Sequence, residues 1–255
     1  MRITFIHHSS FCVEVKDKVF IFDYFRGNRI PEFAFQGRVP EFGADKHIYV
    51  FASHQHRDHF DPEILTWREK YPNIQYIFPK EIKFSDNYLI RKGIDPSVKE
   101  QIHYIRPDSG LCLDSVKVEA LLSTDSGVAF LVEYAGRTLY HAGDLNWWHW
   151  EGEADSFNEY QEKTYKAQID KLTGRAIDVA FVVLDPRLMA SKFLGMDHFL
   201  RHTDASHVFP MHMWRDYRAI AAYKSLPENR LFRERIMDIE KENQVFEICN
   251  STCMV

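Results

Sequence analysis

The chain has 255 residues, a formal net charge of −5 and a hydrophobic share of 45%, with 20 phenylalanines. This apolar content excludes an intrinsically disordered protein, and the length is sufficient to bury a sizeable core. The modest negative charge, without a tract rich in lysine and arginine, argues against a protein that binds nucleic acid.

The N-terminal segment, the apolar runs and the cysteines indicate in which cellular compartment the protein is expected. The N-terminus resembles a strand and has no charged start followed by an apolar stretch, which predicts no signal peptide. No apolar run approaches membrane-spanning length, so we expect a cytoplasmic protein. The cysteines form no C-x-x-C pair and are expected to be thiols. A metal or disulfide role for the last two, four residues apart, is the less favoured alternative. The four are Cys12, Cys112, Cys249 and Cys253.

The first half of the chain predicts alternating strands and helices. Asp61 followed by Pro62 predicts a helix over 62–70, and Gly93 ends a second helix over 80–92. The glycine- and proline-rich stretch 26–45 predicts a long loop of the kind that overhangs a pocket. Apolar segments predict strands at 3–6, 11–15, 19–22, 48–52 and 75–78.

The second half continues the alternation without a repeat or a low-complexity linker. A hairpin is predicted from 128–134 and 137–140, and the charged run 230–235 is expected to be a solvated helix face. Further strands are predicted at 116–121, 179–184 and 245–248, and helices at 156–172, 195–203 and 216–224.

Three imidazoles and a carboxylate follow the apolar strand at 48–52 with the spacing H-x-H-x-D-H. In an extended segment, residues two apart point the same way, so His54 and His56 can converge on one ion. Asp58 and His59 come after the chain turns and can face a second ion. Imidazole nitrogen and carboxylate oxygen suit zinc, and also manganese or iron. A polar loop that happens to be rich in histidine is the alternative.

This motif matches the signature of the metallo-β-lactamase superfamily, whose members are mostly two-metal hydrolases. Residues 6–11 with 19–24 resemble the opening hairpin of the branch that includes the ascorbate-phosphate lactonase-like proteins. The segment 138–144 resembles the family's strand ending in Gly-Asp, and 208–212 resembles the late strand ending in the last metal histidine. The landmarks follow the family's order.

The resemblance implies an α/β fold, a four-layer αβ/βα sandwich of two mixed sheets with helices on the outer faces. A single domain over residues 1–255 is expected. Periodicity alone supports only a mixed α/β protein.

The resemblance also implies a ligand set for two divalent ions. His54 and His56 are expected at the first metal, Asp58, His59 and His212 at the second, and Asp144 between them. A metal-bridged hydroxide would then be the nucleophile, with Asp58 orienting it or moving its proton. Zinc is the first choice, with manganese or iron as alternatives.

One position departs from the family pattern. The family has a further metal histidine before the hairpin, whereas residues 121–127 contain none. We expect Asp125 to supply an oxygen ligand, with Ser123 or Thr124 as weaker candidates; a simple turn before Gly127 is the alternative. An aspartate would shift metal preference towards manganese or iron. Without it, the first metal would bind weakly, which leaves open a mononuclear or degenerate site.

Several residues are expected around the ligands. The counterpart of Asp23 in the family braces a metal histidine, although a strand-end turn residue is the alternative. Of His7 and His8, which alternate in facing, only one can line the pocket, and His8 is the candidate. His141 is expected to be buried and hydrogen-bonded. Asp185, at the end of an apolar strand, is expected to orient a ligand or a substrate group.

An aromatic run follows Asp144 directly. Trp147 and Trp148 are expected to form a pocket wall or lid for a bulky or cyclic substrate. Packing against the following helix is the alternative. His149, within this run, is a candidate proton donor to a leaving group.

Two functions remain. The first is a metal-dependent hydrolase acting on a small ester, lactone or phosphoester. The second is a degenerate or non-catalytic member that binds metal or a ligand as a sensor or regulator. The set Asp58, His59, Asp144 and His212 favours the enzyme, and the missing histidine favours the alternative. We expect a small-molecule substrate and no nucleic-acid or membrane partner; the oligomeric state is open.

Overall fold

The computed structural model describes residues 1–27 and 33–248. The chain forms two compact units, of which the first comprises Met1–Ile105 with Glu242–Val255 and the second Arg106–Lys241. The expected single domain stays a prediction. Cys249 and Cys253 lie outside the described residues. Among the residues that are described, no helix has both the length and the apolar character needed to cross a membrane.

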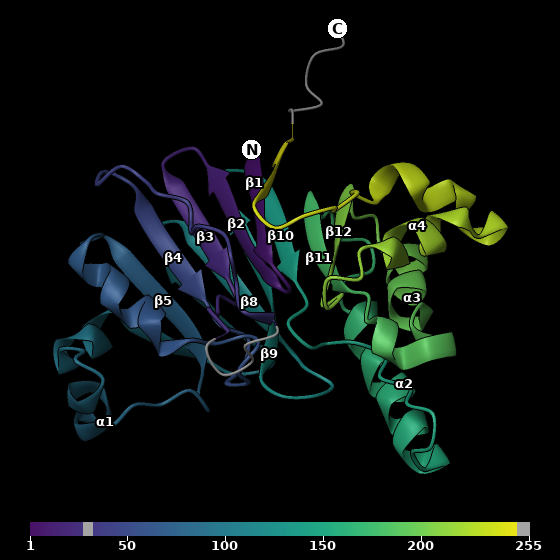
Figure 1. The fold of residues 1–255 in the computed structure, drawn as a ribbon, viewed down its shortest axis with the longest axis horizontal. Coiled ribbons are helices and arrows are strands. Elements are labelled where there is room, and N and C mark those ends of the chain that lie inside the picture. The colour runs from purple at the N-terminus through teal and green to yellow at the C-terminus, as the bar shows by residue number, and fades with distance from the viewer. Residues whose placement is uncertain (28–32, 249–255) are drawn as a thin grey trace, which may run out of the picture. The chain divides into compact units, whose positions relative to one another are not determined.

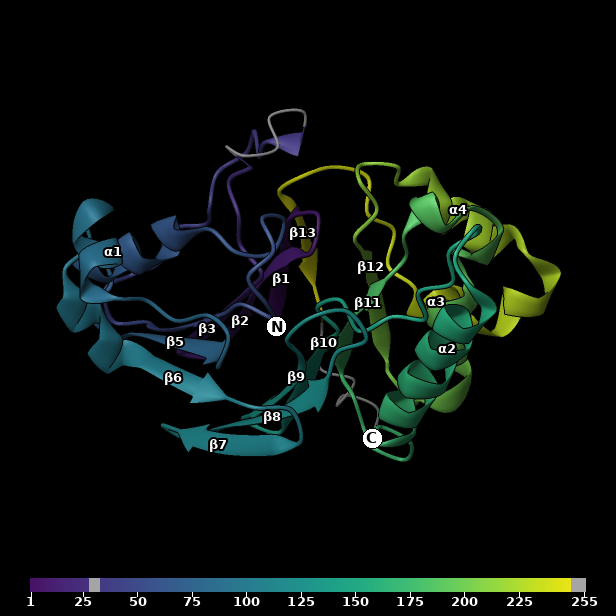
Figure 2. The ribbon, with the colours of Figure 1, turned by 90° about the horizontal axis from the view of Figure 1, so that it is seen from below.

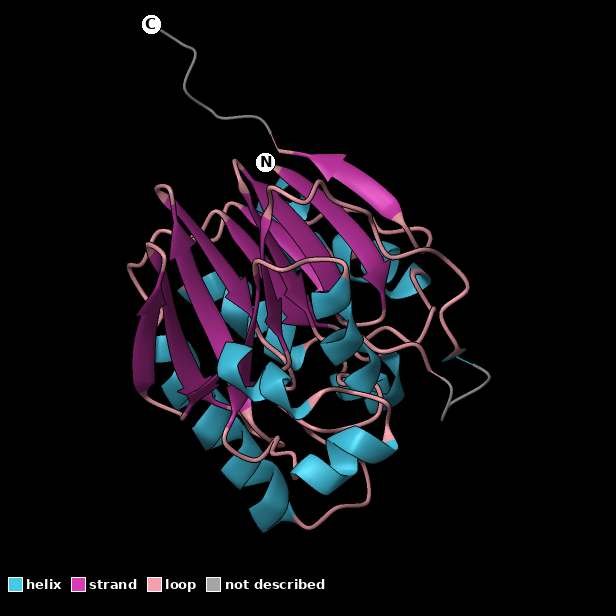
Figure 3. Ribbon diagram, turned by 90° about the vertical axis from the view of Figure 1, so that its left-hand side faces the viewer, coloured by secondary structure: helices cyan, strands magenta, loops and turns pink. Residues whose placement is uncertain are grey.

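The first unit is built on a seven-stranded sheet. Its strands are β1 (Arg2–His7), β2 (Ser10–Val15), β3 (Lys18–Phe22), β4 (His47–Phe51), β5 (Ile74–Pro79), β6 (Ile102–Ile105) and β13 (Gln244–Glu247). They are ordered β13-β1-β2-β3-β4-β5-β6. The pairs from β13 to β3 are antiparallel and those from β3 to β6 are parallel, so the sheet is mixed. β13 is the edge strand beside β1 (Figure 3).

Three short helices pack on the parallel part of this sheet. They are η2 (Pro62–Glu69), α1 (Asp86–Arg91) and η3 (Pro96–Gln101), and α1 lies near β5 (Figure 1). Leu65, Leu89 and Val98, one from each helix, are fully buried in one cluster with Val50 of β4 and Tyr76 of β5. Burial of each such aliphatic side chain stabilises the unit by about 1.5–3 kcal/mol.

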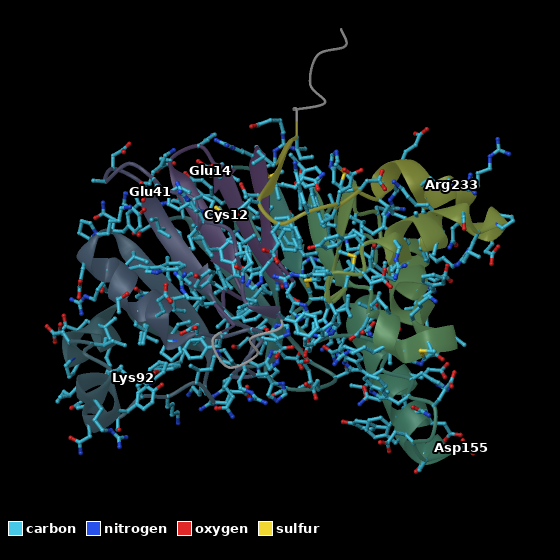
Figure 4. The ribbon with its side chains drawn as sticks, in the orientation of Figure 1. Cys12, Glu14, Glu41, Lys92, Asp155 and Arg233 are labelled. Carbon is cyan, nitrogen blue, oxygen red and sulfur yellow. The ribbon has the colours of Figure 1, made fainter. Side chains whose placement is uncertain are left out.

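Two helix predictions need correction. The predicted helix 62–70 is the 3₁₀ helix η2, which ends at Glu69 and is capped by Asp61, whose side chain accepts from the backbone N–H of Glu63. The predicted helix 80–92 is only the six residues of α1, because Ser85 caps the helix there and accepts from the Tyr88 N–H. Residues 80–84 are therefore outside the helix. Lys92 follows α1, and Gly93 with φ +71° ends the turn as predicted (Figure 4).

The second unit is built on a six-stranded mixed sheet. Its strands are β7 (Ser109–Leu113), β8 (Val116–Leu122), β9 (Val128–Tyr134), β10 (Arg137–His141), β11 (Val179–Val183) and β12 (His207–Met211). They are ordered β12-β11-β10-β9-β8-β7, parallel from β10 to β12 and antiparallel elsewhere. Ala135 and Gly136, both with positive φ, form the predicted turn between β9 and β10. Strand β7 was not predicted.

The helices of the second unit lie on one side of β11 and β12 (Figure 2). They are α2 (Asp155–Asp170), α3 (Leu194–His202), α4 (Arg218–Ser225) and the 3₁₀ helices η4 (Pro186–Ser191) and η5 (Pro227–Arg235). Asp155 begins α2 (Figure 4), and Tyr165 and Ile169 form part of its buried face. The predicted helices here are confirmed within three residues at each end. The expected α/β class with two mixed sheets and helices is confirmed.

Candidate metal centre

The H-x-H-x-D-H motif folds as a turn. Strand β4 ends at Phe51, and the backbone N–H groups of His59 and Phe60 both donate to the His56 carbonyl, at 3.1 and 3.0 Å. The rings of His54 and His56 lie 4.5 Å apart between centroids, and those of His54 and His59 lie 4.3 Å apart. Residues 53–56 are bends and not strand, so strand alternation does not bring His54 and His56 together. The turn expected at Asp58 and His59 is present.

Asp23 holds this turn from the end of β3. Its fully buried carboxylate accepts from the Ser53 backbone N–H at 2.6 Å and from the Ser53 hydroxyl at 2.7 Å. The same carboxylate lies 2.7 Å from Nδ1 of His59. The Ser53 hydroxyl is also 2.9 Å from Nδ1 of His54. These contacts orient both rings through Nδ1, so that a metal ion would be bound through Nε2 of each.

Asp58 and His8 face the other nitrogen of His59. Asp58 Oδ2 lies 3.8 Å from His59 Nε2 and 3.5 Å from His8 Nε2. The donor atoms of these three residues all lie within 4.8 Å of one another, as do those of His54 and His56. The neighbouring His7 points elsewhere, with Nε2 2.6 Å from the Phe25 carbonyl. The expectation that only one of the two histidines faces the motif agrees with this arrangement.

The second unit also carries donor side chains. His212 follows β12 with φ +64°, and its Nε2 lies 3.4 Å from Oδ1 of Asp144. Its Nδ1 lies 3.0 Å from Oδ2 of Asp185, which is fully buried at the end of β11. Asp185 thus orients the His212 ring in the way that Asp23 orients His59. Asp144 is also buried, and its donor oxygen lies within 4.8 Å of that of Asp125.

Arg187, which the sequence did not single out, completes the support of His212. Its guanidinium donates to both carboxylate oxygens of Asp185, from Nε at 3.0 and 2.9 Å. Burial raises the pKa of the Asp185 carboxyl, but the hydrogen bonds from His212 and Arg187 outweigh burial and bring this pKa to about 2. Asp185 is therefore a carboxylate at neutral pH. The guanidinium also lies 4.5 Å from the Trp214 ring.

Asp125 occupies the turn between β8 and β9. Its backbone N–H donates to the Ser123 hydroxyl at 3.3 Å, and the Ser123 N–H donates to the Gly127 carbonyl at 3.4 Å. The Asp125 side chain is exposed on this turn. The Thr124 hydroxyl instead donates to the Asn146 carbonyl at 2.6 Å. Thr124 therefore braces the loop after Asp144, and Asp125 keeps its place as the predicted ligand.

The aromatic side chains that follow Asp144 lie in different surroundings. Trp148 donates from Nε1 to the Asp144 carbonyl at 2.9 Å, and its ring lies 5.7 Å from that of His212. Trp147 instead lies under Lys166 of α2, at 4.3 Å, which agrees with packing against the following helix. His149 is partly exposed and makes no hydrogen bond with another described residue. His141 is buried, and its Nδ1 accepts from the Gly143 N–H at 3.1 Å.

The residues present fit divalent metal ions. Each unit offers imidazole nitrogens and carboxylate oxygens whose donor atoms are close together, and each has a histidine fixed through Nδ1 by a buried carboxylate. This donor chemistry suits zinc, manganese and iron. Sequence reasoning missed Ser53 and Arg187, whose roles depend on contacts with Asp23 and Asp185. Their only sequence signal is proximity to the motif and to Asp185.

Solved structures of several proteins resemble this one. A metallo hydrolase from the archaeon Ignicoccus hospitalis KIN4/I is 16% identical with a TM-score of 0.61, over 97% of this chain and 99% of that one. Human tRNase Z, short form, is 16% identical with a TM-score of 0.58, over 98% and 100%. CmlA, a diiron β-hydroxylase from Streptomyces venezuelae, is 14% identical with a TM-score of 0.53, over 83% and 44%. At these identities the likeness establishes a shared fold.

The sequence itself also matches a family model. The model, described as a beta-lactamase superfamily domain, covers residues 2–149, more than half of the chain. This span includes the H-x-H-x-D-H motif and Asp144. The chain therefore belongs to the metallo-β-lactamase superfamily.

Proposed function

We propose that this protein is a metal-dependent hydrolase of a small ester, lactone or phosphoester, and that its donors hold two divalent ions. In this proposal His54 and His56, with Asp125, are ligands of one ion. Asp58, His59 and His212 are ligands of the other, and Asp144 is shared. Zinc is the first choice of metal, and manganese or iron would be favoured at the ion bound by Asp125 because a carboxylate makes that site harder.

The observation that carries this proposal is a pair of matching histidine supports. His59 and His212 come from different units, and each ring is held at Nδ1 by a fully buried carboxylate, Asp23 or Asp185. A carboxylate behind a histidine fixes the ring's tautomer and raises its basicity, an arrangement that recurs behind metal ligands. The presence of this device in both units supports a metal centre more strongly than the motif does alone.

Individual residues would then have different roles in the reaction. Divalent ions, when bound, supply a nucleophile from water near neutral pH and polarise the group under attack. Asp58, partly exposed beside His59, orients the attacking water and accepts its proton. Trp148 lies against His212 and forms part of the pocket wall. The net charge of −5 favours a small substrate over a polyanionic nucleic acid.

Metal analysis combined with a substrate panel tests this proposal. Wild-type protein, purified without chelators, is expected to contain two ions per chain and to hydrolyse at least one class among esters, lactones and phosphodiesters. The Asp58→Asn variant keeps the shape of the side chain and removes its charge, and should lower kcat by about 10²–10⁴-fold. Asp86→Asn, an exposed carboxylate paired with Lys99, is the matched control and should leave kcat unchanged.

Other outcomes have distinct meanings. Metal-loaded protein that turns over no substrate class would favour the sensor or regulator, and metal-free protein would contradict the metal centre. The His149→Ala variant addresses the remaining aromatic-run hypothesis. If turnover is unchanged, His149 is not the proton donor to the leaving group.

A further inference from the structure

His8 occupies an unusual place in the first unit. It lies in the tight turn between β1 and β2, with φ +51°, and is followed by the fully buried Ser9 and Ser10. Left-handed backbone is uncommon for residues other than glycine, although asparagine, aspartate and histidine adopt it more often than the rest. The side chain of His8 is only 6% exposed, so the turn places an imidazole inside the protein.

The adjacent His7 shows what a structural histidine looks like in this turn. Its Nε2 lies 2.6 Å from the Phe25 carbonyl, and its ring is stacked between Phe25 and Phe35, with centroids at 4.3 and 4.7 Å. His8 contacts Phe25 only edge-on, at 5.8 Å. Its Nε2 is directed instead to Asp58, and its ring is edge-on to His59 at 5.9 Å. The two histidines therefore have different surroundings, and only those of His8 include the proposed metal ligands Asp58 and His59.

The spacing around Asp58 matches ligands that share an ion. His8 Nε2 lies 3.5 Å and His59 Nε2 lies 3.8 Å from Oδ2 of Asp58. Both distances are long for a hydrogen bond between nitrogen and oxygen. Two ligands that are each about 2.1 Å from an ion lie roughly 3.0 Å apart at a right angle and roughly 3.4 Å apart at the tetrahedral angle. The three donors, all from the first unit, are thus spaced as neighbouring ligands.

We propose that His8 is an additional ligand of the divalent ion held by Asp58 and His59. This inference rests on the proposed metal-dependent function and goes beyond the ligand set assigned above. It would give that ion two imidazoles from the first unit, whereas the ion of His54 and His56 lacks the histidine that Asp125 replaces. The two ions would then differ in ligands, with the Asp58 ion better suited to zinc.

Metal binding by a His8→Asn variant tests the inference. Asparagine accepts left-handed backbone readily, so the variant should keep the turn. We expect its affinity for one ion to fall at least 10–100-fold, measured by chelator competition with Zn²⁺. The visible spectrum of the Co²⁺-loaded protein should change as well, because a nitrogen ligand is lost. His47→Asn, at the other end of β4 from the motif, is the matched control and should retain wild-type affinity and spectrum.

The outcomes separate this inference from the proposed function. Wild-type protein that binds two ions, with His8→Asn unchanged in affinity and Co²⁺ spectrum, would overturn the role of His8 alone. Wild-type protein that binds no metal would overturn both. His8→Gly, which fits φ +51° without a side chain, is the second variant if the asparagine form fails to fold. Equal circular dichroism of the metal-free forms establishes that a loss of affinity reflects a lost ligand.

Discussion

The two histidine supports use the same carboxylate contact but balance its charge differently. In the first unit, Asp23 accepts from two neutral donors of Ser53 and contacts His59. In the second unit, Asp185 contacts His212 and is also paired with the cationic Arg187. A buried carboxylate needs compensation for the loss of its hydration. Asp185 therefore has a cationic partner in Arg187, whereas the contacts described for Asp23 are with Ser53 and His59.

Removal of Asp23 should have the largest effect. Asp23→Ala removes the carboxylate that three buried groups contact, the Ser53 N–H, the Ser53 hydroxyl and His59 Nδ1. Each such group costs about 1–3 kcal/mol, so the free energy of unfolding should fall by about 3 kcal/mol or more. Metal affinity should fall by about 10–100-fold. Urea unfolding of metal-free protein and chelator competition measure the two effects. A loss below about 1 kcal/mol would contradict the assigned hydrogen bonds.

Loss of the Asp185 counter-charge should have a moderate effect. Arg187→Met keeps the length of the side chain and leaves the contact between Asp185 and His212. Because the Arg187 side chain is 46% exposed, we expect a loss of only about 1 kcal/mol in unfolding free energy. Arg218→Met, which removes a 90% exposed partner of Asp216, is the control and should change stability little. Equal effects of the two variants would remove the distinction between the supports.

Asp125 is exposed on its turn, and its replacement should separate metal binding from stability. Asp125→Ala should lose one of two ions per chain by elemental analysis, while unfolding free energy of the metal-free form changes by no more than about 0.5 kcal/mol. Ser126→Ala on the same turn is the control. Metal content that is unchanged would mean that Asp125 is only a turn residue.

His198 is the opposite case, an imidazole that has no carboxylate at hydrogen-bond distance among the described residues. Burial, its neighbour His202 and Lys166 lower the pKa of His198 to about 4, although Asp170 and Asp197 oppose this shift. The unfolded chain therefore binds this proton more readily, and stability should fall as pH drops from about 6.5 to about 4. His198→Asn should make this decline shallower in urea unfolding between pH 7.5 and 5. A slope equal to that of wild type would contradict the lowered pKa, and His207→Asn controls for the loss of a histidine.

Local errors in the predicted fold have a local physical cause. The helix expected over 80–92 was predicted from its closing Gly93, but Ser85 begins the helix late, and Ile82 is buried in the core before it. The 62–70 segment has the predicted aspartate cap and proline, yet these signals do not distinguish a 3₁₀ helix from an α-helix. The capping residues therefore predicted the positions of these helices correctly. They did not predict the length of α1 or the 3₁₀ winding of η2.

The sequence by itself determined most of the strands, the metal motif and the family, because apolar periodicity and ligand spacing are local properties of the chain. Only the tertiary structure decided which side chain stands behind each histidine. Asp23 and His59 are 36 residues apart, and Asp185 and His212 are 27 apart. Pairing of β3 with β4 and of β11 with β12 brings the strand ends that carry them together. The tertiary structure also decided which of His7 and His8 faces the motif. The turn with positive φ at His8 directs the His7 ring to Phe25 and the His8 ring to Asp58.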